Sequence, residues 1–331
     1  MSSTNKTPTM KDVATTAGVS IGTVSKVFNG IPVGEEYRIK VLKAAEQLDY
    51  QLNAYARGLR ANKTYTVAVI LPTLVTPFFA ELADLCCQAL RKRNYRTLLA
   101  TTLYDLRQEQ ECVDLVQQNK VDGIIAITYN PDLEINEDIP FVIIDRKFNT
   151  LVPCVSCDNF SGGALAAEKL IENGCRNLLF VGTFSHVSGE VDKRPLGFES
   201  YCRSQNITPT LYKVYDEEGP HAIIQFIDQQ IEDGKFKFDG IFCNTDTIAI
   251  LVIEHLTKLG ISIPDDVQII GFDGIRKPGS DNYFCSTIRQ PLEAMAEAAV
   301  DIVLSENKNM RPALLCLPVS FEYGGTTKNN N

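Results

Sequence analysis

A short segment near the start of the chain combines small, hydroxylated and basic side chains in an order suited to reading DNA. The segment is VSIGTVSKVFNG, residues 19–30. In a helix whose first turns enter the major groove, Ile21, Gly22 and Lys26 would face the base edges. A lysine can donate to guanine O6 and N7, and an isoleucine can pack on a thymine methyl. Gly22 has no side chain with which to read. The candidate phosphate contacts, which fix register but not sequence, are Thr23, Ser25 and Asn29.

A second DNA-contacting segment is expected at residues 53–64, NAYARGLRANKT. Asn53 can cap a short helix that carries Ala56 and Leu59 on one side. An apolar side chain such as Leu59 can enter a base step from the minor groove and kink the duplex. Gly58 costs this helix about 1 kcal/mol relative to Ala, so its order should depend on DNA and dimer contacts. The alternatives are that Leu59 packs on the core and that Lys26 belongs to a solvated face.

Farther along the chain, aromatic and charged residues stand where β-strands are expected to end. Ligands of open parallel sheets bind outside the carboxyl ends of the strands. An arginine there can donate paired hydrogen bonds to vicinal hydroxyls or to a phosphate, and a carboxylate can accept from hydroxyls. An aromatic ring can stack on the apolar face of a sugar. The candidate effector-binding residues are Phe78, Arg146, Arg194, Asp246 and Asp273.

Some of these candidates have a structural alternative. Phe78 or its neighbour Phe79 can belong to the core, Arg146 can pair with a structural carboxylate, and Asp246 can be an acid at the start of a helix. The segment VYDEEGPH places two glutamates at residues 217–218. They would disfavour an anionic ligand, which favours a neutral sugar over a sugar phosphate.

The DNA-reading segment requires a helical scaffold, and the first fifty residues contain its signals. Thr9 with Asp12 forms a capping box, and Gly18 is a helix stop. Ser20 caps the next helix, and a third helix is expected at about residues 35–48. Two short helices joined by a tight turn, followed by a supporting helix, indicate a helix-turn-helix domain.

After residue 64 the pattern changes to an α/β type. Short β-rich runs such as YTVAVILP, DGIIAIT and VQIIGFD alternate with helical runs, which is typical of a parallel sheet with crossover helices. The length favours two doubly wound subdomains. The expected division is a disordered tail at 1–8, a helix-turn-helix domain at 9–50, a hinge helix or linker at 51–63, one core subdomain at 64–160 and 290–320, and a second at 161–289 and 321–331.

Composition and charge restrict the classes of function. The 331 residues carry a net charge of −9, but residues 1–61 carry +3 and the rest −12, so only the head is suited to a polyanion. No apolar run is long enough for a membrane span, and the first ten residues lack an apolar secretory segment, so a cytoplasmic protein is expected. The ten cysteines, with Cys154 and Cys157 in PCVSCDN, are interpreted as small hydrophobic residues.

Five segments carry a family resemblance: TMKDVATTAGVSIGTVSKVFNG, LNAYARGLR, IFCNTDTIA, IPDDVQIIGFDG and STIRQPLEAM. In this order they closely resemble the LacI/GalR family of transcription regulators. The resemblance implies an N-terminal all-α headpiece, a hinge helix and an α/β core like that of periplasmic sugar-binding proteins. It also implies a homodimer on palindromic operator DNA, and effector contacts most consistently at Arg194 and Asp273. The chain departs from many relatives at Gly22, where they have a polar residue, and at Leu52, where they often have proline.

The sequence therefore predicts a DNA-binding repressor of carbohydrate-related genes, controlled by a small-molecule effector that is a sugar. The alternatives are a regulator that responds to a purine, a sugar phosphate or a protein co-regulator, and a sugar-binding protein without a DNA role. The sequence lacks the phosphate-binding motifs GxGxxG and GxxxxGK[ST], and it lacks a nucleophile with a matching base. An enzyme, a cofactor and a metal site are therefore not expected. The ending YGGTTKNNN lacks a leucine-rich tail, which favours a dimer.

Overall fold

The computed structural model describes residues 8–28, 31–50, 63–146, 152–215, 217–307 and 311–329. The chain divides into two compact units, Met1–Thr64 and Tyr65–Asn331. The hinge segment, with Ala56 and Leu59, lies outside the described residues, as does Asn29. The predictions made for those three residues remain predictions. In the described ranges no helix has the length and apolar character needed to cross a membrane.

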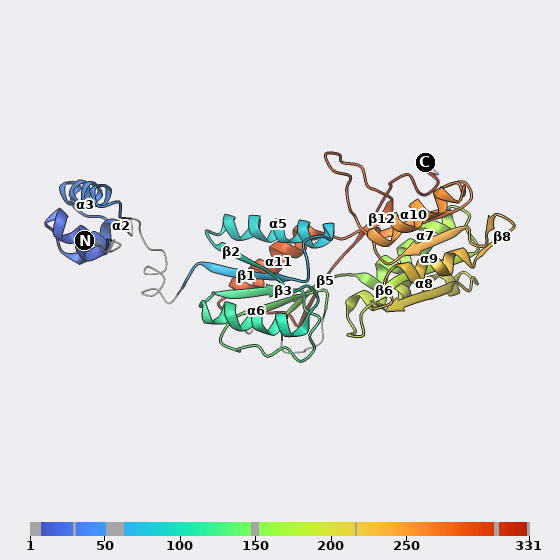
Figure 1. Cartoon of the computed structure of the whole chain (residues 1–331), viewed down its shortest axis with the longest axis horizontal. Coiled ribbons are helices and arrows are strands. Elements are labelled where there is room, and N and C mark those ends of the chain that lie inside the picture. The colour runs from blue at the N-terminus through green and yellow to red at the C-terminus, as the bar shows by residue number, and fades with distance from the viewer. Residues whose placement is uncertain are drawn as a thin grey trace, which may run out of the picture. The chain divides into compact units, whose positions relative to one another are not determined.

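The first unit is a small helical domain built from the expected local signals (Figure 1). Its helices are α1 (Met10–Ala17), α2 (Ile21–Phe28) and α3 (Glu35–Gln47). Thr9 and Asp12 form the predicted capping box, in which the Thr9 amide donates to Asp12 Oδ2 over 2.7 Å. Gly18 ends α1 in the left-handed conformation, with φ of 64°, where glycine has no steric penalty. The Ser20 hydroxyl accepts from the Thr23 amide at 3.0 Å and begins α2.

The three helices enclose a core of small apolar side chains. Val13, Val24 and Val41 have no exposed surface, and Ala44 and Ala45 complete the buried set. Small residues let short helices approach closely, so a domain of this size can still exclude water from a core. The residues that fill this core leave the first turn of α2 exposed, where Ile21 is 42% exposed.

The second unit contains two six-stranded sheets within its described residues. In the first sheet the strand order is β13-β5-β4-β3-β1-β2, and every pair is parallel. The elements of this half are β1 (Thr66–Leu71), α5 (Pro77–Lys92), β2 (Arg96–Thr101), α6 (Leu106–Gln118), β3 (Gly123–Ala126), β4 (Phe141–Ile144), β5 (Cys154–Cys157), α11 (Leu292–Leu304) and β13 (Leu314–Leu317).

The second sheet has the order β14-β12-β11-β10-β6-β7 and is parallel except where β14 pairs with β12. Its half of the unit contains α7 (Asn159–Glu172), β6 (Leu178–Phe184), the 3₁₀ helix η1 (Glu190–Asp192), α8 (Lys193–Ser204), β7 (Thr210–Tyr215), α9 (His221–Asp228), β10 (Gly240–Cys243), α10 (Asp246–Lys258), β11 (Gln268–Asp273), β12 (Ser286–Arg289), β14 (Ser320–Glu322) and the small hairpin β8 (Ile231–Glu232) and β9 (Lys235–Phe236).

Helices cover both faces of each sheet, as the continuous apolar runs of the strands require. In β1 the alternate residues Val67, Val69 and Leu71 face α5 and α11, while Ala68 and Ile70 face α6. Figure 1 shows α5 and α6 on opposite sides of this sheet. In β6, Phe180 packs in the cluster that contains α7 and α8 side chains, and Val181 packs in the cluster of α9 and α10.

In the described part of this unit the chain passes between the two sheets at three places. It crosses after β5 into α7, after β12 into α11, and after β13 into β14. Because these crossings lie together at the ends of strands, the two lobes are joined there by three separate backbone connections. The space between the lobes is therefore bordered by strand ends from both sheets.

Candidate effector site and DNA-reading helix

Helix α2 presents its expected reading residues to solvent. Ile21, Gly22 and Lys26 are exposed, while Val24 on the opposite side is fully buried. Thr23 and Ser25 are partly exposed, and the Thr23 hydroxyl is 2.9 Å from that of Ser20. A methyl group at Gly22 would meet only Ser20 Oγ, at 3.5 Å. A partner could therefore approach the backbone at Gly22 closely, although Gly22 offers no side chain.

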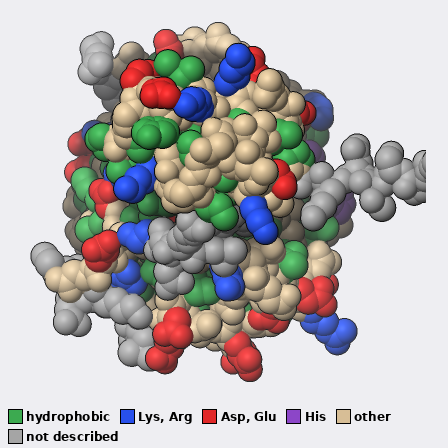
Figure 2. Space-filling view, turned by 90° about the vertical axis from the view of Figure 1, so that its left-hand side faces the viewer, with side chains coloured by type: hydrophobic (Ala, Val, Ile, Leu, Met, Phe, Trp, Pro, Cys, Tyr) green, Lys and Arg blue, Asp and Glu red, His purple; other side chains and the backbone are tan. Residues whose placement is uncertain are grey.

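The surface charge alone does not identify a DNA-binding face. On the face drawn in Figure 2, the Lys and Arg side chains of the described residues lie among Asp and Glu side chains, and hydrophobic side chains are scattered between them. DNA contact is instead indicated by the helix-turn-helix geometry and by the residues that α2 exposes.

A cavity of about 830 Å³ lies between the two lobes of the second unit. Several of its wall residues lie within three positions of the end of a strand: Tyr129 after β3, Asp145 after β4, His186 after β6, Asn244 after β10 and Gln290 after β12. This is the position that the sequence predicts for a ligand, because carboxyl ends of parallel strands meet at one edge of a sheet.

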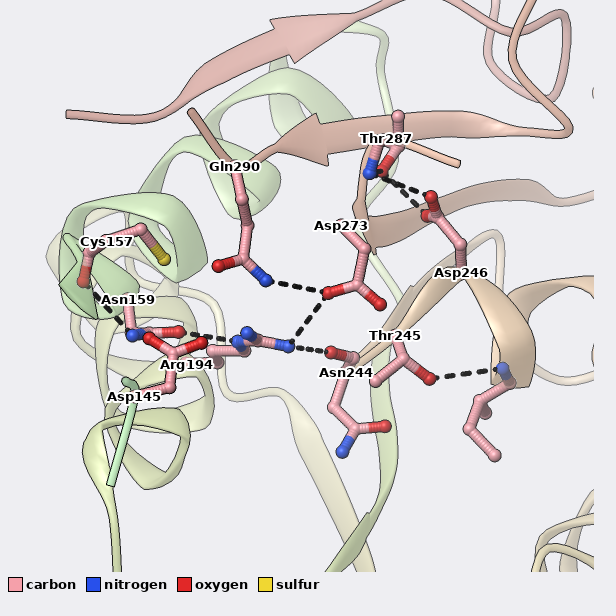
Figure 3. A network of polar contacts seen from close by, with 12 residues as sticks. Asp145, Cys157, Asn159, Arg194, Asn244, Thr245, Asp246, Asp273, Thr287 and Gln290 are labelled. Carbon is pink, nitrogen blue, oxygen red and sulfur yellow. Dashed lines mark hydrogen bonds and ion pairs between the residues drawn. The ribbon is translucent and has the colours of Figure 1, made fainter. Parts of the chain in front are cut away.

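Arg194 is at the centre of a buried polar network at the closed end of this cavity (Figure 3). Its Nε donates to Asn159 Oδ1 at 2.7 Å, and its Nη1 donates to the Asn244 carbonyl at 2.5 Å. Nη1 also lies 3.7 Å from Asp273 Oδ1. The guanidinium stacks on the Phe272 ring at 3.6 Å from its centroid. The arginine is 2% exposed, so its direction is fixed by these contacts before any ligand binds.

Asp273 and Asp145 are the carboxylates of the network. Gln290 Nε2 donates to Asp273 at 2.8 Å, and Ser156 Oγ donates to Asp145 at 2.7 Å. Burial raises the pKa of Asp273 to about 8, although Arg194 lowers it. Burial also raises the pKa of Asp145, against the opposing effects of Arg194 and Ser156. With a pKa of about 8, the Asp273 carboxyl is protonated at neutral pH and can both donate to and accept from a hydroxyl.

Two further features mark this end as prepared for a ligand. Asp145 and Asp273 are non-glycine residues with positive φ, 60° and 127°, and such strained conformations are concentrated at functional sites. The buried amide oxygens Asn244 Oδ1 and Gln290 Oε1 have no hydrogen-bond partner. Leaving such atoms unsatisfied costs about 1–3 kcal/mol each, so the network at this end is itself strained.

Asp246 requires a correction to the sequence interpretation. Its side chain has no exposed surface and does not line the cavity. Oδ2 accepts from the Gly274 and Ile275 amides at 2.9 and 2.7 Å, and Oδ1 accepts from Thr287 Oγ1 at 2.7 Å. These donors already satisfy the carboxylate. Asp246 therefore fixes the turn that follows Asp273 and does not itself contact a ligand.

Arg146 and the two phenylalanines do line the cavity. The Arg146 guanidinium stacks on the Tyr129 ring at 3.6 Å, and its Nη1 donates to the Val187 carbonyl of the opposite lobe at 3.1 Å. Phe78 and Phe79 are 7% and 8% exposed and pack edge to face. Both phenylalanines belong to the hydrophobic core and to the cavity wall, so the two roles expected from the sequence coexist.

Sequence reasoning missed several wall residues, namely Tyr104, Tyr129, Asp145, His186, Asn244 and Gln290. The rule that placed Asp273 at a strand end applies equally to Asp145, Asn244 and Gln290, whereas Arg194 lies in the first turn of α8. His186 lines the cavity with a side chain that is 64% exposed, and its Nε2 lies 3.3 Å from Glu217 Oε2. Tyr104 lies in a loop whose position depends on tertiary structure.

The thiols and histidines show other roles where the structure describes them. Cys154 and Cys157 are buried in β5, in agreement with their interpretation as small hydrophobic residues. Burial raises the pKa of Cys157 well above its usual value. His255 pairs with Asp228 at 2.6 Å. Within the described ranges, His, Cys, Asp and Glu side chains form no cluster of three or more that could hold a metal ion.

A helix-turn-helix domain in one chain with a two-lobed ligand cleft defines a ligand-responsive, DNA-binding transcription regulator. Residues 9–53 match the family of bacterial regulatory proteins called lacI, and residues 167–327 match the periplasmic binding protein-like domain. The sucrose operon repressor of Pediococcus pentosaceus is 30% identical over 325 residues, which cover 96% of this chain and 99% of that protein. The chain belongs to the LacI family of bacterial regulatory proteins.

Two other comparisons agree with this assignment. The ribose operon repressor of Bacillus subtilis is 30% identical over 329 residues, covering 97% of this chain and 98% of that protein. The crystal structure of the Lac repressor bound to ONPG has a TM-score of 0.81 at 21% identity and covers 97% of this chain and 100% of that chain. The last comparison shows that the fold is shared.

Proposed function

We propose that this regulator represses carbohydrate-related genes, and that a neutral saccharide in the cleft controls its affinity for operator DNA. The observation that carries the proposal is the wall of the cavity, which combines Arg194, Asp145 and Asp273 with the aromatic rings of Phe78, Phe79 and Tyr129. Buried donors and acceptors at fixed positions, next to apolar faces, match a polyhydroxylated ring. The related repressors are named for the sugar operons of sucrose and ribose.

The electrostatics favour a neutral ligand over a sugar phosphate. Both arginines of the cavity are already engaged, Arg194 by Asn159 and Asn244, and Arg146 by Val187 and Tyr129. The wall also contains Asp145, Asp273 and Glu217. A phosphate would therefore meet two arginines whose donors are already in use and, at Glu217, a carboxylate of its own sign. Its desolvation would be poorly compensated.

On the DNA side, we assign base contacts to Ile21 and Lys26 and close backbone approach to Gly22. Two headpieces of a homodimer would place these residues in successive major grooves of a palindrome. The proposed phosphate contacts are Thr23, Ser25 and Asn29, and the proposed minor-groove residues are Ala56 and Leu59. The protein acts by binding, without a catalytic step or cofactor, in the cytoplasm where chromosomal DNA is accessible.

The test is selection of an operator from random duplex DNA by the full-length protein, followed by affinity measurements with sugars, sugar phosphates and purines. A single enriched palindrome, with an affinity that a neutral sugar changes, is the expected result. Lys26→Ala should relax base preference at one position of each half-site. Failure to enrich any sequence would refute the DNA-reading assignment, and a response to phosphorylated sugars alone would refute the neutral effector.

A further inference from the structure

The cavity has two ends of different character. At the closed end, Arg194, Asp273 and Gln290 are between 1% and 7% exposed. At the open end, Tyr104 is 47% exposed, and the side chains of His186 and Glu217 are 64% and 68% exposed. These exposed residues line the same cavity as the buried network and form its solvent-facing rim.

Tyr104 is held at this mouth by an unusual backbone. Leu103 and Tyr104 are consecutive non-glycine residues with positive φ, 52° and 62°, a conformation that is an outlier for bulky side chains. The segment is fixed by the Leu103 amide, which donates to the Pro72 carbonyl at 2.8 Å. The Tyr104 ring packs edge to face on Tyr129 at 5.1 Å, and the Arg146 guanidinium stacks on Tyr129 at 3.6 Å. The first lobe thus presents a fixed aromatic wall.

The second lobe presents another ring at the mouth. The His186 ring stacks on Tyr215, with centroids 4.2 Å apart and planes inclined by 16°. His186 Nε2 lies 3.3 Å from Glu217 Oε2. This arrangement combines a flat face with a carboxylate that can accept from hydroxyls, so both lobes carry groups suited to a sugar ring at the same rim.

We infer that the mouth is a second sugar-ring subsite and that the effector is a two-ring saccharide. One ring binds the closed end through Arg194 and Asp273, and the second ring lies against Tyr104 and His186. The inference rests on the proposed function, since it names the substrate class of that cleft. The cavity of about 830 Å³ is large among small-molecule sites, which span about 300–1,000 Å³. Tyr104 is thereby a specificity-determining residue.

The experiment is titration calorimetry on the full-length protein with sucrose, maltose, cellobiose, trehalose and lactose, and with glucose, fructose, galactose and ribose. At least one disaccharide should bind about tenfold or more tightly than either of its component monosaccharides. Tyr104→Ala should weaken that disaccharide about tenfold, the effect of one lost ring contact, and change any monosaccharide affinity by less than about twofold.

A matched control is Tyr323→Ala, because Tyr323 is 49% exposed and does not line the cavity; it should leave all affinities unchanged. His186→Ala is a second variant of an exposed mouth residue and should repeat the selective loss if Tyr104→Ala fails to fold. Monosaccharides that bind as tightly as disaccharides, or mouth variants that weaken both classes equally, would overturn the second subsite and leave the proposed function standing. No binding of any sugar would overturn both.

Discussion

The headpiece and the cleft are organised by interactions of very different range. In the headpiece, Thr9 and Asp12 cap α1 across three residues, and Ser20 caps α2 by a contact to Thr23. In the cleft, Arg194 bonds residues 35 and 50 positions away, and Asp246 bonds Thr287 across 41 positions. The reading helix therefore depends on local sequence, whereas the cleft depends on the packing of the whole second unit.

This difference has a functional consequence. A locally stabilised headpiece can keep its reading face whichever conformation the ligand unit adopts. The cleft network draws residues from both lobes, with Asp145 on one side and Asp273 on the other. A ligand that binds both sides must favour one arrangement of the lobes over another, which is the requirement for control of a distant activity. The predictions below separate these two behaviours.

The largest effect is expected where the cleft tolerates no added atom. A methyl group at Gly163 of α7 would lie 1.9 Å from the Arg194 carbonyl oxygen of α8. Gly163→Ala must therefore separate the two helices and displace Arg194. We expect a loss of about 3 kcal/mol in the free energy of unfolding of the ligand unit and a loss of saccharide binding. Heat unfolding and calorimetry measure these effects.

The headpiece is the internal control for that variant. Residual binding to non-specific DNA should persist at temperatures where the ligand unit of Gly163→Ala has unfolded. If saccharide binding and non-specific DNA binding are lost at the same temperature, the two units unfold together and the headpiece is not independently stable.

Asp246→Asn should destabilise the ligand unit by about 2 kcal/mol. The asparagine keeps one oxygen, so its NH2 group must face either the Gly274 and Ile275 amides or the Thr287 hydroxyl, and the donors on that side lose their buried acceptor. Sugar affinity should fall less than stability, because Asp246 acts on the ligand site only through the turn that follows Asp273. Chemical denaturation checks the stability. A variant with unchanged stability but no sugar binding would restore the ligand-contact role that the structure removes from Asp246.

Asp273→Asn should change how stability depends on pH. The folded pKa of Asp273, about 8, lies above the value of about 4 expected in the unfolded chain. Between these values the folded state holds a proton that the unfolded state has released, so stability relative to the asparagine variant is greatest below pH 4 and is lost as pH rises through 8.

The measurement is a series of unfolding curves between pH 4.5 and 8.5 for both proteins. The wild type should lose stability relative to Asp273→Asn across this window, and the variant should bind saccharide more weakly at every pH. If the free energies of unfolding of the two proteins change with pH in parallel, the pKa of Asp273 is near its usual value.

These regions also differ in how much of them the sequence predicts. The caps of α1 and α2 follow from residues three positions apart, and all three headpiece helices were predicted. The strand-end rule located Asp273, because the carboxyl edge is a property of topology, whereas Arg194 lies in the first turn of α8 and was indicated by the family resemblance. For Asp246 the sequence left a ligand contact and a helix-start acid open, since its donors at residues 274, 275 and 287 are adjacent only after folding. Short strands such as β5 and β13, and the left-handed loop at Tyr104, carry too little local signal to be predicted.

The smallest effect is expected in the headpiece, at Gly22. This residue is exposed, and a methyl group there would make only an ordinary contact with Ser20 Oγ at 3.5 Å. Since glycine within a helix costs about 0.5–1 kcal/mol relative to alanine, Gly22→Ala should stabilise α2 by about that amount. Hydrogen exchange of the α2 amides in the full-length protein measures this gain.

The DNA affinity of the same variant then decides whether Gly22 faces the bases. If the backbone at Gly22 approaches the groove closely, the added methyl group should lower operator affinity even though the helix is more stable. Thr16→Ala, on the exposed side of α1, gains helix propensity without touching α2 and should not lower operator affinity. A rise in affinity with Gly22→Ala would show that this residue points away from the groove, and the register assigned to Ile21 and Lys26 would have to be moved along α2.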